Sequence, residues 1–304
     1  MSSKSPRFEG VYTAVVTPFH ADGAIDLDGY RALLEDQIAG GVTGIVTCGT
    51  TGEASTMSRE ERAKVIKATV EIVNGRVPVI AGAGSNDTKV AVEQQAEVKA
   101  LGADASLQVT PWYNKPTQEG LYRHFATVVE KSPLPTILYN VPGRTSVDML
   151  PDTVVRLAKG NEHIVAVKEA TGSIQRAQDI LCKTATELPG FTVLSGDDGF
   201  ILGLIAIGGH GVISVTSHLC VADLVAMIAA QRAGDHARAQ ALSRKTHPLA
   251  NALFFRANPI PVKAALAMTR LKGKMHDHVR LPLVPLDDKD RAELMGMLAR
   301  AGYA

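Results

Sequence analysis

The chain has 304 residues, of which 45% are hydrophobic and 21% are charged, a composition that is ordinary for a globular protein with a large core. Lys and Arg number 32 against 31 Asp and Glu, so the formal net charge is +1, and aromatic residues make up only 5%. Surfaces that bind nucleic acid or anionic membranes need clustered positive charge, and base-stacking platforms need aromatic side chains, so we expect neither nucleic acid nor a membrane as a partner.

Short apolar segments of β-forming residues alternate with helix-like patterns from the N-terminus to about residue 213. The expected strands are Val11–Thr17, Gly44–Thr47, Val77–Ala81, Ala105–Thr110, Thr136–Asn140, Ile164–Lys168, Thr192–Ser195 and Gly211–Val215. Strands that are apolar at nearly every position are typical of a parallel sheet buried on both faces. Eight strand–helix units in about 215 residues favour an α/β fold of the closed (β/α)8 TIM-barrel type, with an open doubly wound sheet as the alternative.

Helix-start patterns support several of the intervening helices. The expected helices include Leu27–Ala39, Arg59–Val73, Lys89–Leu101 and Gln118–Lys131. Ser58 and Glu61 at the start of the second of these have the spacing of a capping box. Pro151 and Asp152 suit the first turn of a further helix that runs to about Lys159.

From His218 onward the sequence is Ala-rich and helical, without a further strand pattern. The expected helices there are Val221–Ala233, Asp235–Phe255, Pro261–Thr269 and Asp288–Ala301. We therefore expect a barrel catalytic domain over residues 1–230 and a C-terminal helical domain over residues 231–304, the latter as an extension of the barrel.

The cysteines and the apolar runs bear on the compartment. Cys48, Cys182 and Cys220 lie far apart and form no Cys-x-x-Cys pair, which suits neither a disulfide scaffold nor a Cys-based zinc site and favours a reducing compartment. The first ten residues lack the apolar core of a signal peptide. The longest apolar run, Phe200–Ile207, is far shorter than the ~20 residues needed to cross a bilayer. We expect a cytoplasmic protein.

Polar residues follow five of the expected strands, at the barrel edge where TIM-barrel active sites lie. These clusters are Cys48–Glu53, Thr110–Pro116, Tyr139–Thr145, Val167–Gly172 and Ser195–Asp198. Each cluster alone is compatible with an ordinary turn, but five of them at one edge predict a site.

Lys168 closes the apolar run that begins at Ile164, and its side chain shares a strand face with Ile164 and Ala166. If that face is the barrel interior, the ammonium group loses hydration, which favours the neutral, nucleophilic amine. A neutral amine attacks a ketone to form a Schiff base. The alternative is a lysine at a strand end that reaches into solvent.

Tyr139 ends the neighbouring strand, so its phenol could reach a group held by Lys168. Thr50 or Tyr113 would supply the partner through which a tyrosine passes protons. The alternative is an aromatic side chain packed at the barrel edge for its area alone.

Two features suit carboxylates. Gly49 and Gly52 flank two threonines and permit close backbone approach, so exposed N–H groups there suit one carboxylate. Arg144 follows a Pro-Gly turn and offers a bidentate fork for a second. The alternatives are a tight turn and a solvated surface arginine.

Other common sites lack support. Gly82–Ser85 begins like a dinucleotide fingerprint but has Asp87 where the last glycine should be, and no P-loop, H-E-x-x-H or G-x-S-x-G pattern occurs. The nine histidines are scattered, so we expect no metal site. Asp197 and Asp198 are better explained as helix N-caps than as acidic catalysts, and His210 as part of the turn into the last strand.

Several of these stretches together resemble the dihydrodipicolinate synthase family, within the pyruvate-dependent class I aldolases. The resemblance runs from about residue 11 to about residue 269. Its motifs are Gly49–Glu53, Tyr139–Thr145, Lys168–Gly172, Gly209–Ser214 and Asn258–Lys263.

The resemblance implies a (β/α)8 barrel with a C-terminal helical domain, a homotetramer built as a dimer of dimers, and condensation of pyruvate with L-aspartate 4-semialdehyde. It makes Lys168 the Schiff-base lysine and requires no metal or organic cofactor. It also implies a proton relay of Tyr139, Thr50 and Tyr113, with Tyr113 reaching the neighbouring subunit's site.

The same resemblance assigns the binding residues. Thr51 looks like the ligand of the pyruvate carboxylate and Arg144 like the ligand of the semialdehyde carboxylate. The backbone at Gly196 and Ile213 would line the pocket.

Two other readings remain. An N-acetylneuraminate lyase or a keto-sugar-acid aldolase would share the lysine and the tyrosine, although Arg144 suits a small acidic aldehyde better than a polyhydroxylated chain. A non-catalytic barrel that senses a small molecule is the reading of a different class.

The region that binds lysine in feedback-inhibited relatives departs from their pattern. Arg59 and Arg62 stand where those relatives often carry histidines, Val90 where they carry an acid, and Trp112 where they carry a tyrosine. We therefore expect weak or absent inhibition by L-lysine.

Overall fold

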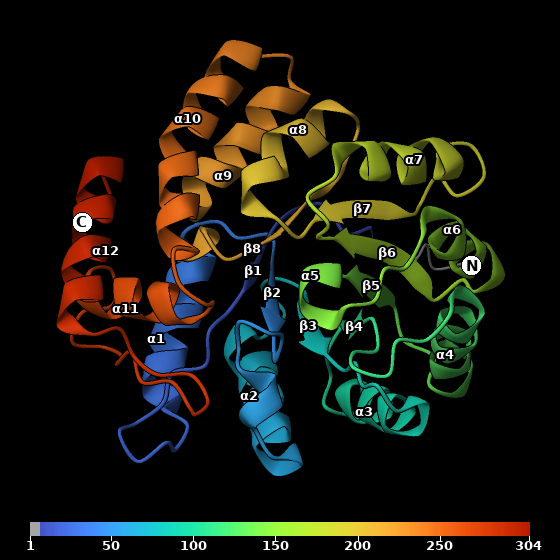
Figure 1. Ribbon diagram of the computed structural model, residues 1–304, viewed down its shortest axis with the longest axis horizontal. Helices are drawn as coiled ribbons and strands as arrows, with labels where there is room; N and C mark the ends of the chain where they lie inside the picture. The colour runs from blue at the N-terminus through green and yellow to red at the C-terminus, as the bar shows by residue number, and fades with distance from the viewer. Residues whose placement is uncertain (1–6) are drawn as a thin grey trace. The chain divides into compact units, whose positions relative to one another are not determined.

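The computed structural model describes residues 7–304 and contains a closed barrel of eight parallel strands in the order β1 to β8 (Figure 1). The strands are β1 Gly10–Ala14, β2 Gly44–Thr47, β3 Val79–Gly82, β4 Ala105–Val109, β5 Thr136–Asn140, β6 Ile164–Glu169, β7 Thr192–Ser195 and β8 Gly211–Ser214. Nearly every strand residue is buried, as expected for strands packed on both faces. The predicted (β/α)8 barrel is confirmed, and the open sheet is excluded.

Two strand boundaries differ from the prediction by more than one residue, each for a local reason. β3 begins at Val79 rather than Val77, because Pro78 has no N–H to donate to the ladder. β1 ends at Ala14, although Val15–Thr17 remain buried beyond it. The β-forming residues Val15–Thr17 made the predicted strand longer than the segment that pairs with β2.

The helices that follow the strands agree closely with the sequence pattern. They are α1 Leu27–Ala39, α2 Arg59–Val73, α3 Thr88–Ala100, α4 Gln118–Lys131, α5 Pro142–Thr145, α6 Pro151–Gly160, α7 Ile174–Thr184 and α8 Ile201–Ala206, with short 3₁₀ turns at Ala54–Thr56 and Asp198–Phe200. The predicted capping box is present, since Ser58 Oγ accepts from Glu61 N at 3.2 Å and Glu61 Oε2 accepts from Ser58 N at 2.9 Å.

The C-terminal part is helical, as predicted. Its helices are α9 Ser217–Arg232, α10 His236–Leu253, α11 Ile260–Met268 and α12 Asp288–Ala301, and α10 packs against the other three. No helix within residues 7–304 is both long enough and apolar enough to span a bilayer.

The chain packs as two compact units. One comprises Ile80–Ile213 together with residues 7–10, and the other comprises Val11–Val79 together with Ser214–Ala304. The predicted division between residues 230 and 231 stays a prediction.

A large apolar core lies in the first unit, between β5–β7 and the helices α4, α6 and α7, which follow one another side by side in Figure 1. Its fully buried members include Leu121, Phe125, Leu138, Val167 and Ile180. Burying each such side chain contributes about 1.5–3 kcal/mol, so this core holds the ends of β5 and β6 in fixed positions.

His218, in the second unit, is fully buried at the start of α9. Its Nδ1 lies 2.7 Å from the carbonyl oxygen of Val215, and its Nε2 accepts a hydrogen bond from the Val16 N–H at 3.2 Å. A proton added to Nε2 would face that N–H, so the buried ring is held neutral. Burial accordingly lowers the pKa of His218 from its ordinary value of 6.5 to about 4.

We expect the free energy of unfolding to fall as the pH drops from about 6.5 to about 4. In that range the unfolded chain binds a proton at His218 that the folded chain does not, which amounts to about 3 kcal/mol over the whole range. Thermal unfolding of the wild type and of His218→Gln across this range measures the effect, and the variant should show a shallower slope. Identical slopes would contradict the assignment. His124, whose pKa burial also lowers to about 4, contributes in the same direction in both proteins.

Candidate functional site

Lys168 and Tyr139 lie side by side at the carboxyl ends of β6 and β5, where the two residues are direct partners in the parallel register. Both are buried, with 7% and 6% of their surface exposed. Lys168 Nζ lies over the Tyr139 ring, 4.1 Å from its centroid, close enough for a cation–π contact. The alternative in which Lys168 reaches into solvent is therefore excluded, and its amine faces an aromatic ring instead of bulk water.

Glu169 follows Lys168 and points to the other face of the strand, because successive strand side chains alternate. Its carboxylate is buried and fully engaged: Oε2 is 3.1 Å from Arg176 Nε, Oε1 accepts from the Thr171 N–H at 2.9 Å, and Asn140 Nδ2 lies 3.3 Å from Oε2. Arg176 also binds Asp148 at 3.0 Å. This cluster fixes the strand ends that carry Tyr139 and Lys168, and the sequence analysis did not identify it.

Gly196, just after β7, packs directly against the lysine. Its N–H donates to the Glu169 carbonyl at 2.7 Å. A Cβ at this position would lie 2.6 Å from Ala170 Cβ and 3.0 Å from Lys168 Cε, so only glycine fits here without movement of its neighbours. That the backbone of Gly196 lines a substrate pocket stays a prediction.

We expect Gly196→Ala to lower the rate of any reaction at the Lys168 amine by about tenfold or more, because the added methyl group pushes the Lys168 side chain off its position over Tyr139. The rate of reductive trapping of a keto acid at Lys168 is the measurement. Gly190→Ala is the control, since a Cβ at Gly190 meets no atom within 4 Å. Equal trapping rates in the two variants would show that the tight packing has no bearing on the amine.

The structure places the other predicted residues of this unit in differing surroundings. Ile213 is buried in β8, with 1% exposed. Arg144 is exposed on α5, the short helix that follows β5. Tyr113 is 89% exposed on the loop after β4 and has a positive φ of 72°. Lys168 thus lies beside both Tyr139 and Gly196, whereas Arg144 and Tyr113 present their side chains to solvent.

The second unit holds Thr50 and Thr51 in the loop after β2. Thr50 is exposed, whereas Thr51 is 4% exposed and its Oγ1 accepts a hydrogen bond from Asn258 Nδ2 at 2.9 Å. Two residues further on, the carboxylate of Glu53 lies 2.6 Å from Lys263 Nζ, and both side chains are buried. Burial lowers the pKa of Lys263, and the Glu53 carboxylate offsets part of that shift.

Sequence reasoning gave no role to Asn258 or Lys263. Both lie in the stretch Asn258–Lys263 that resembles the aldolase family, so the signal was present, but their partners are two hundred residues away in the chain.

Of the two aspartates predicted as N-caps, only Asp197 is one: its Oδ1 accepts from the Gly199 N–H at 2.8 Å, whereas Asp198 is the first residue of the short 3₁₀ turn itself. His210 lies just before β8, as predicted, and its Nδ1 accepts from the Val193 N–H at 3.0 Å. Within residues 7–304, no three His, Cys, Asp or Glu side chains are grouped as a metal ion would need.

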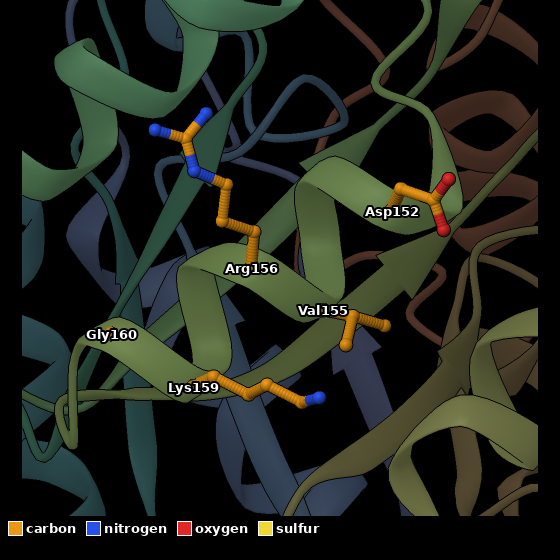
Figure 2. Close-up of a pocket in the computed structure, with 5 residues that line it drawn as sticks. All are labelled: Asp152, Val155, Arg156, Lys159 and Gly160. Atoms are coloured by element: carbon orange, nitrogen blue, oxygen red, sulfur yellow. The ribbon is translucent and has the colours of Figure 1, made fainter.

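A hollow on the outer face of α6 is lined by Asp152, Val155, Arg156, Lys159 and Gly160 (Figure 2). Its charged side chains are already paired with neighbouring segments: Arg156 with Glu119 of α4 at 2.7 Å, Asp152 with Lys183 of α7, and Lys159 with Glu187 in the turn after α7. These charges serve contacts between α6 and its neighbours, so the hollow is not a second candidate site.

Known proteins match this chain over nearly its whole length. The model of the dihydrodipicolinate synthetase family matches residues 7–301. The 4-hydroxy-tetrahydrodipicolinate synthase of Maridesulfovibrio salexigens is 52% identical over 97% of this chain and 99% of its own length. The crystal structure of dihydrodipicolinate synthase from Thermotoga maritima superposes with a TM-score of 0.94 at 41% identity, covering 98% of this chain and all of the other.

A further solved structure is that of the Acinetobacter baumannii dihydrodipicolinate synthase complexed with pyruvate. It has a TM-score of 0.92 and 43% identity, and it covers 97% of this chain and 99% of that one. The match to the family model alone spans nearly the whole chain. The chain belongs to the dihydrodipicolinate synthetase family.

Proposed function

We propose that this protein is a 4-hydroxy-tetrahydrodipicolinate synthase, a lyase that joins pyruvate to L-aspartate 4-semialdehyde through a Schiff base on Lys168. The observation that carries the proposal is the buried Lys168 amine, 4.1 Å from the centroid of the Tyr139 ring at the ends of two paired strands. The full-length relatives that carry this enzyme's name support it. The function is a step in the diaminopimelate and lysine pathway.

The reaction begins at the Lys168 amine. The neutral nitrogen attacks the ketone carbon of pyruvate, water leaves, and an imine forms. Loss of a proton from the pyruvate methyl group gives an enamine, whose carbon attacks the aldehyde carbon and forms the new C–C bond. The amino group of the former semialdehyde then displaces Lys168 by transimination, which closes the ring and frees the lysine.

Each of these steps needs a proton added or removed, which we assign to a relay of Tyr139, Thr50 and Tyr113. Tyr139 is placed beside the amine, whereas Tyr113 extends into solvent and would serve the site of a neighbouring subunit. We assign the pyruvate carboxylate to Thr51 and the semialdehyde carboxylate to Arg144, with the backbone of Gly196 and Ile213 beside the substrate. All of these steps use protein side chains alone, without a metal or organic cofactor.

Incubation with pyruvate and borohydride tests the proposal. A mass increase of one reduced pyruvate adduct, mapped to Lys168 by peptide analysis, is expected. Absence of the adduct would overturn the proposal and favour the sensor reading. Steady-state assays with pyruvate and each candidate aldehyde then separate the synthase from N-acetylneuraminate lyase and keto-sugar-acid aldolases, since Arg144 favours the small acidic aldehyde.

We further propose that the protein works in the cytoplasm as a homotetramer, a dimer of dimers. Trp112 and Tyr113 are adjacent and both exposed on one loop, which supports an interface there, because contiguous exposed apolar surface often marks an interaction site. Sedimentation velocity of the wild type and of Tyr113→Ser measures the assembly.

We expect L-lysine to inhibit this enzyme weakly or not at all. A lysine ligand carries an α-ammonium group that needs an anionic partner, and Val90 supplies none where inhibited relatives carry an acid. Arg59 and Arg62 add positive charge at positions where inhibited relatives often carry histidines. Initial rates with and without millimolar lysine provide the measurement, and a rate halved by lysine would contradict the expectation.

A further inference from the structure

Among residues 7–304, the side chain of Asn258 makes one hydrogen bond, to Thr51. Its Nδ2 lies 2.9 Å from Thr51 Oγ1, and both residues are buried, at 8% and 4% exposed. The amide oxygen Oδ1 is buried and has no hydrogen-bond partner among the described residues. The hydrogen bond that this buried side chain does make is therefore to the Thr51 hydroxyl.

Both segments that meet in this hydrogen bond, the start of α11 and the loop that carries Thr51, are held by further contacts. Asn258 immediately precedes Pro259, the N-cap of α11, and Lys263 of that helix is bound to Glu53 at 2.6 Å. Glu53 in turn follows Thr51 by two residues and also accepts from the Arg280 N–H at 3.0 Å. The loop that carries Thr51 and the start of α11 are therefore tied together at two points.

The direction of the hydrogen bond decides what Thr51 can do. A hydroxyl has one proton and two lone pairs, and an amide nitrogen only donates. When Asn258 Nδ2 donates to Thr51 Oγ1, the hydroxyl proton points elsewhere and is free for another acceptor. An ionised carboxylate is an acceptor only, so it can take that proton.

We propose that Asn258 is a positioning residue that holds the Thr51 hydroxyl as a hydrogen-bond donor for the carboxylate of pyruvate. The proposal rests on the proposed function, in which Thr51 binds that carboxylate. Asn258 does not touch the substrate, and its effect passes through the Thr51 oxygen.

The first test compares Asn258→Asp with Asn258→Ala in pyruvate titrations of the borohydride-trapped Lys168 adduct. An ionised Asp only accepts, so it reverses the hydroxyl and should raise the half-saturating pyruvate concentration by about tenfold, more than Ala does, whereas the KM for the semialdehyde should change little. Asn251→Asp, at an exposed position on α10, adds the same charge and serves as the control. A pyruvate titration of Asn258→Asp equal to that of the wild type would overturn the proposal.

A second test separates this effect from a loss of structure or from charge repulsion. In a Thr51→Val background the hydroxyl is absent, so Asn258→Ala should then change the pyruvate titration no further. If Asn258→Asp still raises the half-saturating pyruvate concentration in the Thr51→Val background, that increase measures the effect of the added charge alone. If Asn258→Ala weakens pyruvate equally with and without the Thr51 hydroxyl, Asn258 acts through the fold and the proposal is wrong.

The two hypotheses fail in different ways. A wild-type protein that forms no pyruvate adduct at Lys168 contradicts the proposed function, whatever Asn258 does. A wild type that forms the adduct, with variants that show no dependence on the Thr51 hydroxyl, contradicts only the role of Asn258.

Discussion

Lys168→Ala is expected to abolish the borohydride-trapped pyruvate adduct and to lower turnover by at least about a thousandfold. The reason is that the amine is the atom to which pyruvate becomes covalently attached, and its neighbour Tyr139 has no group that can form an imine. Intact-protein mass spectrometry after reduction measures the adduct, and a coupled assay measures turnover. The fold should remain largely intact, since the strand ladder of β6 is made by backbone groups.

Two further variants control for packing and for non-specific labelling. Lys168→Met keeps an apolar stem of similar length against Tyr139, so it should unfold at nearly the wild-type temperature yet form no adduct. Lys131→Ala, at an exposed position at the end of α4, should form the adduct as the wild type does. Turnover retained by either Lys168 variant would refute the assignment of the nucleophile.

Arg144→Ala should leave pyruvate trapping intact but raise the KM for the semialdehyde by about ten- to a hundredfold, the usual worth of a hydrogen-bonded pair with a charged group. The side chain is exposed on α5, so stability should change little. Steady-state kinetics with each substrate varied in turn measures the split.

Arg123→Ala removes an exposed arginine from α4 and is the matched control, with both KM values expected to stay near those of the wild type. If Arg144→Ala instead abolished pyruvate trapping while the KM for the semialdehyde held, the carboxylate assignments of Thr51 and Arg144 would be reversed.

The fold was largely predictable because strand and helix patterns in this chain are local. Each barrel strand is a short apolar run, and capping residues such as Ser58 mark helix starts directly. The largest errors are in the strand boundaries. Val15–Thr17 are buried but do not belong to β1, and β3 begins only after Pro78, which has no N–H to donate. Neither the hydrophobic pattern nor β-propensity reports which buried residue has a ladder partner.

The site was predictable only where strand order determines it. Lys168 and Tyr139 are each the residue before the last in consecutive strands of a parallel barrel, so their contact follows from topology. The bond between Asn258 and Thr51, like the ion pair between Lys263 and Glu53, joins segments about two hundred residues apart, and no local periodicity encodes such a pairing. The glycine requirement at Gly196 depends on distances of a few tenths of an ångström, which sequence does not convey.

The ion pair between Glu53 and Lys263 also limits how the protein can be shortened. Glu53 belongs to a loop in the first fifth of the chain, yet its buried carboxylate depends on a cation contributed by α11 near the other end. Cutting the chain after α10 would leave that anion in an apolar environment without its counter-charge, a loss of about 3–5 kcal/mol. The C-terminal helices are therefore not a removable tail, and a minimal version of this enzyme must retain them through Lys263 or replace Glu53 with an uncharged side chain.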